Sequence, residues 1–213
     1  MSLSQILTER KSKNEQNIPS DKWAIMERAT KDLKTENLSN KAIKTGEILP
    51  NFSLPNIHNN LVSLTDFNAD FLIVSFYRGG WCPFCNMELK ALQDILPEAK
   101  KLNTELVAIS PETPDNSITT HEKNELSFEV LSDLNNTYAT SIGLVFQLPE
   151  DLREVYHSFN IDVPKHNNNN DYELPMPATY VLNSKREIIY HFIPEDYTER
   201  LEPTTILEVI KNA

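Results

Sequence analysis

The chain has 213 residues, of which 39% are apolar, and it carries a formal net charge of -11. This length suffices for one domain with a sizeable core plus a smaller appendage. The acidic balance gives no electrostatic support to binding of nucleic acid or of an anionic membrane surface, and no segment has the length and apolar character of a membrane span.

Residues 1–42 are expected to form a helical N-terminal extension outside the main domain. They are charged and contain no glycine, and a helix is predicted from Lys22 to Lys34 with Ser20 and Asp21 as its cap. Its apolar side chains share one face: Trp23, Met26, Ala29 and Leu33. The extension is expected to dock on the main domain, and the alternative is a dimerisation arm.

Residues 43–213 are expected to form an α/β domain. After an extended segment at 49–55, strands are predicted at 61–64, 70–77, 105–110, 128–133, 179–182 and 187–192, and helices at 86–102, 117–124, 135–142 and 203–212. The nearly continuous apolar run from Phe71 to Tyr77 is typical of a central strand buried on both faces. The last two strands are expected to form a hairpin. This order predicts a mixed central sheet flanked by helices.

The two cysteines of the chain, Cys82 and Cys85, follow the central strand and begin a helix. Their spacing lets both sulfurs meet over one helical turn, so a reversible intramolecular disulfide is feasible. The N-terminus of a helix has unpaired N–H groups and a partial positive charge, which both favour thiolate over thiol. The segment from Met1 to Lys13 lacks the apolar run of an export signal. We therefore expect redox chemistry in the cytoplasm.

Two other interpretations of the cysteine pair stay open, namely two inert buried thiols or part of a zinc site. Structural zinc usually takes four Cys or His ligands, and the five histidines are scattered along the chain. We therefore expect no metal and no other cofactor.

Four segments follow one another in the order found in a known family: Gly46–Pro55, Val62–Phe67, Ala108–Pro114 and Leu131–Asp133. On these segments, residues 44–192 resemble the alkyl hydroperoxide reductase and thiol-specific antioxidant branch of the peroxiredoxins, in particular the bacterioferritin-comigratory-like members. The resemblance implies a thioredoxin-like fold. It also implies a thiol-dependent peroxidase that needs no metal, flavin or haem and is recycled by a thioredoxin- or glutaredoxin-type donor.

The active-site segment is similar to two families at once. Aligned on the peroxiredoxin motif Pro-x-x-x-Thr-x-x-Cys, Arg78, Cys82 and Cys85 take the proline, threonine and peroxidatic cysteine positions. Glu88 then matches a glutamate that often follows three residues later. Aligned on thioredoxin, the segment Trp81–Cys85 is similar to Trp-Cys-Gly-Pro-Cys, and Cys82 becomes the attacking thiol.

A second departure lies at Pro177. Many peroxiredoxins have a catalytic arginine there, whereas thioredoxins have a cis-proline beside the disulfide, so a cis bond is expected before Pro177. Arg78 is then a candidate for the missing positive charge; the alternatives are a surface charge or an ion pair with Glu88. Trp81 is expected to pack over the sulfurs and shield them. Cys82, Cys85 and Arg78 are thus the predicted catalytic residues, with Trp81, Pro177 and Glu88 around the substrate.

The main functional hypothesis is a peroxidase that reduces hydrogen peroxide or organic hydroperoxides through Cys82 and Cys85. The alternatives are an oxidoreductase acting on protein disulfides, and a redox-sensing or zinc-binding protein in which two pairs meet across a homodimer. We expect Cys82 to react first in thiol-disulfide exchange because it lies at the helix start. Cys85 is expected to react first with peroxide, which is small enough to reach a recessed sulfur.

Overall fold

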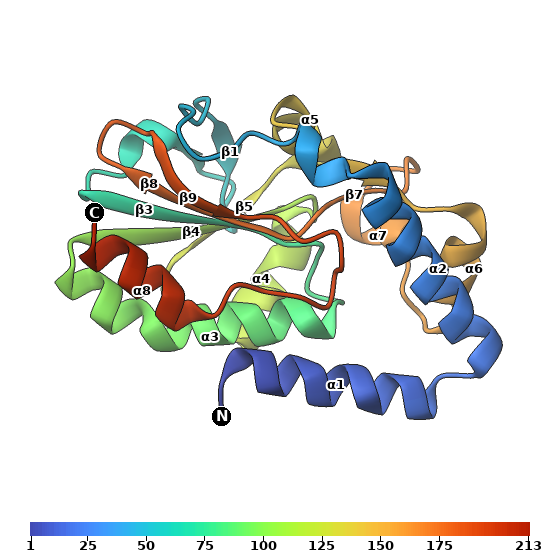
Figure 1. Cartoon of the computed structure of the whole chain (residues 1–213). Coiled ribbons are helices and arrows are strands. Elements are labelled where there is room, and N and C mark those ends of the chain that lie inside the picture. Colours follow the sequence, from blue (N-terminus) through green and yellow to red (C-terminus); the bar gives the residue numbers. More distant parts are fainter.

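The computed structural model describes all 213 residues and shows a five-stranded mixed sheet at the centre of the molecule (Figure 1). Its strand order is β5-β4-β3-β8-β9, with β3, β4 and β5 parallel and β8 antiparallel to both β3 and β9. The strands of this sheet are β3 (Phe71–Phe76), β4 (Thr104–Ser110), β5 (Glu129–Ser132), β8 (Ala178–Asn183) and β9 (Ile188–Phe192). The predicted mixed sheet and closing hairpin are confirmed.

Two small two-stranded sheets flank the central one. The first pairs β1 (Ser53–Pro55) with β2 (Leu61–Ser63), and the second pairs β6 (Val145–Gln147) with β7 (Glu173–Pro175). The sequence predicted the first pair as extended segments and missed the second.

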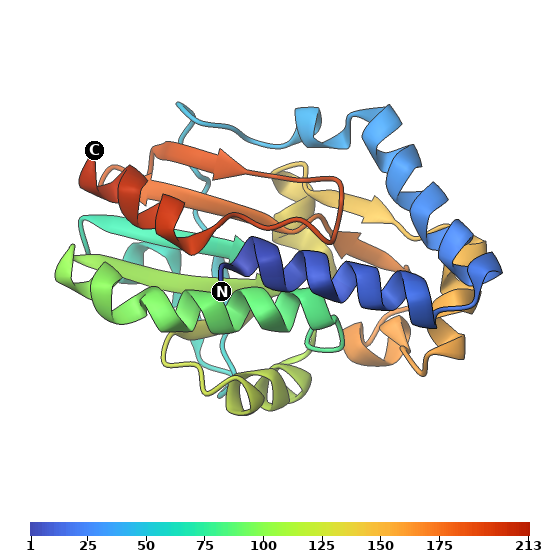
Figure 2. The same cartoon turned by 60° about the horizontal axis from the view of Figure 1, so that its bottom comes forward.

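Helices cover both faces of the sheet. The α-helices are α1 (Leu3–Asn17), α2 (Ser20–Glu36), α3 (Pro83–Lys101), α4 (Pro114–Lys123), α5 (Thr137–Ser141), α6 (Glu150–Ser158), α7 (Val163–Asn167) and α8 (Pro203–Lys211). Short 3-10 turns lie at Leu38–Lys41, Leu64–Asp66 and Leu134–Asn136. Helices α3 and α8 lie on one face of the sheet, with α1 alongside α3 (Figures 1 and 2). None of the helices has the length and apolar character needed to cross a lipid bilayer.

Strand β3 contributes to a core on each side of the sheet. Ile73 packs among residues of α3 and α8, whereas Leu72, Val74 and Phe76 pack among residues of the segment 38–67 and of α5. Each of these four side chains is at most 1% exposed. Because successive residues of a strand point to opposite faces, burial on both faces requires the apolar run seen in the sequence.

The two N-terminal helices pack against the rest of the protein. Leu3 and Leu7 of α1 are buried with residues of α3 and α8. Helix α2 packs on α6 through a separate core that includes Trp23, Met26 and Ala29. The predicted helix is confirmed but begins earlier, because Pro19 is the N-cap and accepts the N–H of Trp23 at 2.9 Å. A domain boundary at residue 42 stays a prediction.

Candidate active site

The loop between β3 and α3 turns sharply through two glycines. A Cβ on Gly79, whose φ is +148°, would lie 2.3 Å from Nε1 of Trp81, and a Cβ on Gly80 would lie 1.8 Å from Oγ1 of Thr120. Both contacts exclude a side chain. The N–H of Gly80 donates to Oε2 of Glu112 at 2.8 Å, which holds the loop against the segment after β4.

Both cysteines lie at the start of α3, where the loop places them. Cys82 is the N-cap residue, Pro83 is the first helical residue, and Cys85 lies one turn further in. Both are free thiols and are buried, at 2% and 0% exposure. The two thiols are close enough to shift each other's pKa.

The two thiols have opposite pKa shifts. Burial disfavours the thiolate of Cys82, but the hydrogen bond from Cys85 and the charges of Arg78 and Arg200 outweigh it and lower the pKa to about 6. Burial and the neighbouring Cys82 raise the pKa of Cys85 well above its ordinary value. The opposite directions favour a thiolate on Cys82 and a protonated thiol on Cys85.

Arg78 follows β3 and is 2% exposed, so it is not a surface charge. Its guanidinium carbon lies 5.1, 5.6 and 4.7 Å from the ring centroids of Trp81, Tyr156 and Tyr197. Nη2 donates to the hydroxyl of Tyr156, whereas Nε has no partner. No carboxylate pairs with this cation. The expected alternative of an ion pair with Glu88 is wrong, because a different arginine occupies that position.

That arginine is Arg200, which lies in the connection between β9 and α8. The sequence did not point to Arg200 as a residue of the site. Nη2 donates to Sγ of Cys85 at 3.2 Å, and Nε pairs with the carboxylate of Glu88. Nη1 donates to the carbonyl oxygens of Tyr197 and Glu199 at 2.7 and 2.6 Å. No local signal identifies Arg200, because it contacts residues more than 110 positions away in the chain. Only the folded topology brings this connection to the start of α3 (Figure 1).

Glu88 lies on the buried face of α3, beneath Cys85. Burial raises the pKa of its carboxyl to about 7, although the charge of Arg200 acts in the opposite direction. Oγ1 of Thr179 in β8 donates to its second oxygen at 3.4 Å. The buried carboxylate of Glu88 therefore holds the guanidinium of Arg200 in position beside Cys85.

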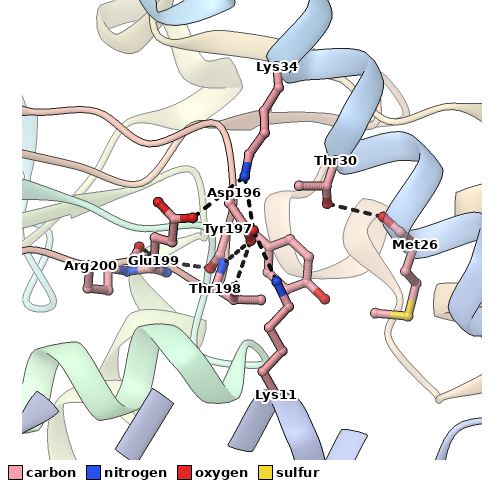
Figure 3. Close-up of polar contacts among 9 residues, drawn as sticks. All are labelled: Lys11, Met26, Thr30, Lys34, Asp196, Tyr197, Thr198, Glu199 and Arg200. Carbon is pink, nitrogen blue, oxygen red and sulfur yellow. Dashed lines mark hydrogen bonds and ion pairs between the residues drawn. The ribbon is translucent and has the colours of Figure 1, made fainter. Parts of the chain in front are cut away.

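The turn that carries Arg200 is also attached to both N-terminal helices (Figure 3). Oδ2 of Asp196 accepts from the Nζ atoms of Lys11 in α1 and Lys34 in α2, at 3.2 and 3.3 Å. Oδ1 accepts the backbone N–H of Thr198 at 3.0 Å and its hydroxyl at 2.7 Å. One carboxylate thus links the N-terminal helices to the turn beside Cys85.

A cleft of about 530 Å³ leads to Cys82. One wall comes from α1 and the start of α2, and the other from the active-site loop and the α6–α7 region. Cys85 does not line it. Trp81 is half-buried, lines the cleft beside Cys82 and packs edge-on against Tyr156 with ring centroids 5.6 Å apart.

Pro177 lies elsewhere. It lines a second cavity of about 400 Å³ beneath α2, together with Arg78 and Tyr156. The expected cis bond is wrong, because the chain has no cis peptide bond. Only Met176 and Pro177 separate β7 from β8, and the trans form is preferred by about 0.5–1 kcal/mol for X–Pro bonds. Among the side chains, no group of three or more Cys, His, Asp or Glu is placed to hold a metal ion.

A Cys-x-x-Cys pair between the central strand of a mixed sheet and the helix that follows it is typical of the thioredoxin-fold class. Residues 45–191 match the model of the AhpC/TSA family, and the chain belongs to this family.

Curated relatives support this assignment. Peroxiredoxin Bcp of Escherichia coli K12 is 33% identical over 102 residues, which cover 48% of this chain and 65% of that protein. A putative peroxiredoxin bcp of Haemophilus influenzae is 31% identical over 102 residues, covering 48% of this chain and 66% of that protein. The matched part of this chain thus spans slightly less than two thirds of the length of these relatives.

Solved structures show the same fold. Peroxidoxin BcpB from Mycobacterium tuberculosis superposes with a TM-score of 0.63 at 18% identity, covering 80% of this chain and 97% of that one. The bacterioferritin comigratory protein of Xanthomonas campestris, described for its alkyl peroxide reduction activity, has a TM-score of 0.58 at 12% identity, with 76% and 90% covered. These similarities confirm the predicted thioredoxin-like fold.

Proposed function

We propose that this protein is a thiol-dependent peroxidase and that Cys82 is the thiol that attacks the peroxide. The observation that carries this proposal is a thiol with a pKa of about 6 that lines a cleft and lies next to a second thiol. A thiolate is the nucleophilic form of cysteine, and membership of the AhpC/TSA family favours peroxide as the substrate.

The reaction balances with the two cysteines alone. The Cys82 thiolate attacks one oxygen of the O–O bond; the bond breaks, the alkoxide or hydroxide leaves and takes a proton from water, and Cys82 becomes a sulfenic acid. Cys85 then attacks the sulfur of Cys82. The disulfide forms, and the thiol proton of Cys85 leaves with the sulfenic hydroxyl as water. A thiol donor returns the disulfide to the dithiol by exchange.

This assignment differs from the sequence-based hypothesis, which gave the peroxide to Cys85. Cys85 keeps its proton, is 0% exposed and does not line the cleft. A peroxide that enters through the cleft meets the sulfur of Cys82 first. In this proposal Arg78 stabilises the Cys82 thiolate, and Arg200 donates to Cys85 and stabilises it when it leaves as a thiolate.

An oxidoreductase acting on protein disulfides is the second candidate, favoured by the thioredoxin-like segment Trp81–Cys85. The 2% exposure of Cys82 weighs against it, because a folded substrate needs an accessible sulfur. A thioredoxin- or glutaredoxin-type donor, a homodimer and a place in the cytoplasm stay predictions.

Stopped-flow oxidation tests the proposal. The reduced protein should consume one equivalent of hydrogen peroxide or organic hydroperoxide per cysteine pair and give an intramolecular disulfide on non-reducing gels. With peroxide and dimedone, Cys85→Ser should be labelled on Cys82, and Cys82→Ser should not be labelled. Labelling of Cys82→Ser alone would assign the peroxide to Cys85. Peroxide reaction no faster than that of free cysteine, with rapid reduction of insulin disulfides, would favour the second candidate.

A further inference from the structure

The cleft above Cys82 has an unusual charge for this protein. The chain has 20 basic and 31 acidic residues, yet the lining of the cleft contains three cations and no acidic side chain. Arg10 and Lys13 come from α1, and Arg78 follows β3. Neither Arg10 nor Lys13 forms a salt bridge, unlike Lys11, which pairs with Asp196 (Figure 3). The cleft is therefore suited to an anion.

Arg78 strengthens this argument because its charge is buried without a carboxylate. In the dithiol state the Cys82 thiolate balances it. In the disulfide state that negative charge is gone, and the guanidinium keeps only the hydroxyl of Tyr156 and the surrounding rings. A buried unpaired charge is unfavourable, so the oxidised site gains most from an incoming anion.

The size and the walls of the cleft limit what that anion is. A volume of about 530 Å³ is typical of a small-molecule site. The lining also contains apolar side chains: Ile18, Met26, Phe84, Phe159 and Ile161. Cys82 lines this cleft and is only 2% exposed, which favours a slender molecule over the surface of a folded protein as the partner that reaches its sulfur.

We propose that the donor that recycles the Cys82–Cys85 disulfide is a low-molecular-weight thiol that carries carboxylates, held by Arg10 and Lys13, in place of the thioredoxin- or glutaredoxin-type donor expected from the family resemblance. This inference rests on the proposed function, since it names the reductant of the same site. It assigns the N-terminal helix α1 a direct role in binding that donor.

The exchange takes two equivalents of thiol. The first thiolate attacks Sγ of Cys82 and the S–S bond breaks. Cys85 leaves as a thiolate, next to the donating Nη2 of Arg200, and takes up a proton. A second thiolate then attacks the sulfur of the bound donor, releasing the Cys82 thiolate and the symmetric disulfide of the donor. Two electrons pass from the two donor thiols to the protein.

A matched series of thiols tests the proposal without any peroxide. The protein disulfide is formed with diamide, and its reduction is followed by titration of free cysteine thiols with 3-mercaptopropionate, 2-mercaptoethanol or cysteamine, which are anionic, neutral and cationic. At equal thiolate concentrations we expect the anionic thiol to react about tenfold faster than the neutral one, with the advantage shrinking as salt is added. The double variant Arg10→Gln/Lys13→Gln should lose most of this advantage and should slow 2-mercaptoethanol by a smaller factor, because its reacting thiolate carries one negative charge and that of 3-mercaptopropionate carries two.

Lys90→Gln is the matched control, because Lys90 is exposed on α3 and does not line the cleft. Three outcomes would overturn the proposal. The three thiols could react at equal rates, or Lys90→Gln could lose the advantage of the anionic thiol as much as the double variant does. A thioredoxin could also reduce the disulfide faster than the anionic thiol, at a rate that is the same in the double variant. Failure of the reduced protein to react with peroxide would instead overturn the proposed peroxidase function, and the rates of this thiol series would not change.

Discussion

Arg78 and Arg200 both act on the cysteine pair and are both buried, at 2% and 6% exposure, but their surroundings differ. Arg200 pairs with Glu88 and donates to two carbonyl oxygens and to Cys85. Arg78 has one hydroxyl and three aromatic rings. The charge of Arg200 is balanced by the carboxylate of Glu88, whereas Arg78 has no negatively charged partner except the thiolate of Cys82.

The difference gives the two arginines different roles: one charge stabilises the structure of the site, and the other affects the reactivity of a thiol. A buried cation with a carboxylate partner fixes a turn and holds a neighbouring thiol in place. A buried cation without such a partner favours the negative form of whatever lies beside it. Arg78 should therefore act mainly on the reactivity of Cys82, and Arg200 mainly on the stability of the site.

The largest expected effect is on stability. Arg200→Met leaves the Glu88 carboxylate buried without a partner and should lower the free energy of unfolding by about 3 kcal/mol. Arg78→Met, measured in the disulfide form, removes a cation that has no carboxylate and should change this free energy by less than about 1 kcal/mol. Urea unfolding of the disulfide forms at pH 8 measures both.

The control is the double variant Glu88→Gln/Arg200→Met, which should recover at least half of the loss because no charge is then left unpaired. The loss in Arg200→Met should also shrink toward pH 5. The pKa of Glu88 is already raised to about 7, so protonation there removes the unpaired charge. Equal losses for Arg78→Met and Arg200→Met would show that the two arginines do not differ in this way.

The second effect is on the pH dependence of Cys82. A pKa of about 6 leaves about 90% of the thiol ionised at pH 7, whereas an ordinary value of about 8.5 leaves about 3%. Arg78→Gln removes one of the charges that lower the pKa, so alkylation of Cys82 by iodoacetamide at pH 7 should slow by up to about 30-fold. The rate should rise with pH through a midpoint near 6 in the wild type and at a higher pH in the variant.

Glu88→Gln/Arg200→Gln serves as the comparison, since it removes a cation together with its own counter-ion. Its midpoint should move less than that of Arg78→Gln. A larger shift in the double variant would assign the main electrostatic role at Cys82 to Arg200.

The sequence predicted the parts of the site that depend on neighbouring residues. The apolar run of β3 and the Cys-x-x-Cys spacing are both local. The partners of each arginine are not local, because Arg78 meets Tyr156 and Tyr197 only after folding. Nothing near Arg78 in the chain predicts that it is buried without a carboxylate.

Helix α6 is a different kind of omission, because its signal was present. Leu152, Val155 and Tyr156 are spaced three and four residues apart and are buried, and Pro149 with Glu150 and Asp151 marks the start of a helix. Strands β6 and β7 have three residues each, which is too short for a periodic pattern to identify. The strands of the central sheet and helices α2, α3, α4 and α8 were predicted, with ends that shifted by a few residues, whereas α1 was not predicted as a separate helix.

The smallest expected effect concerns Asp196, which joins α1 and α2 to the turn of Arg200 (Figure 3). Burial opposes its charge, but the hydrogen bonds from Thr198 and the charge of Lys11 outweigh it and lower the pKa to about 2. Asp196→Asn should lower the free energy of unfolding by about 1 kcal/mol, after allowance for solvent screening. Because a lowered carboxyl pKa stabilises the fold above about pH 4 and loses that effect as the pH falls toward 2, the unfolding free energies of variant and wild type should converge in acid.

Asp196→Asn should also be cleaved faster by proteases within residues 1–36, because both ion pairs to these helices weaken. Lys31→Gln, an exposed change on α2, is the control. Equal cleavage of all three proteins would show that Asp196 does not hold the N-terminal helices beside the cysteine pair.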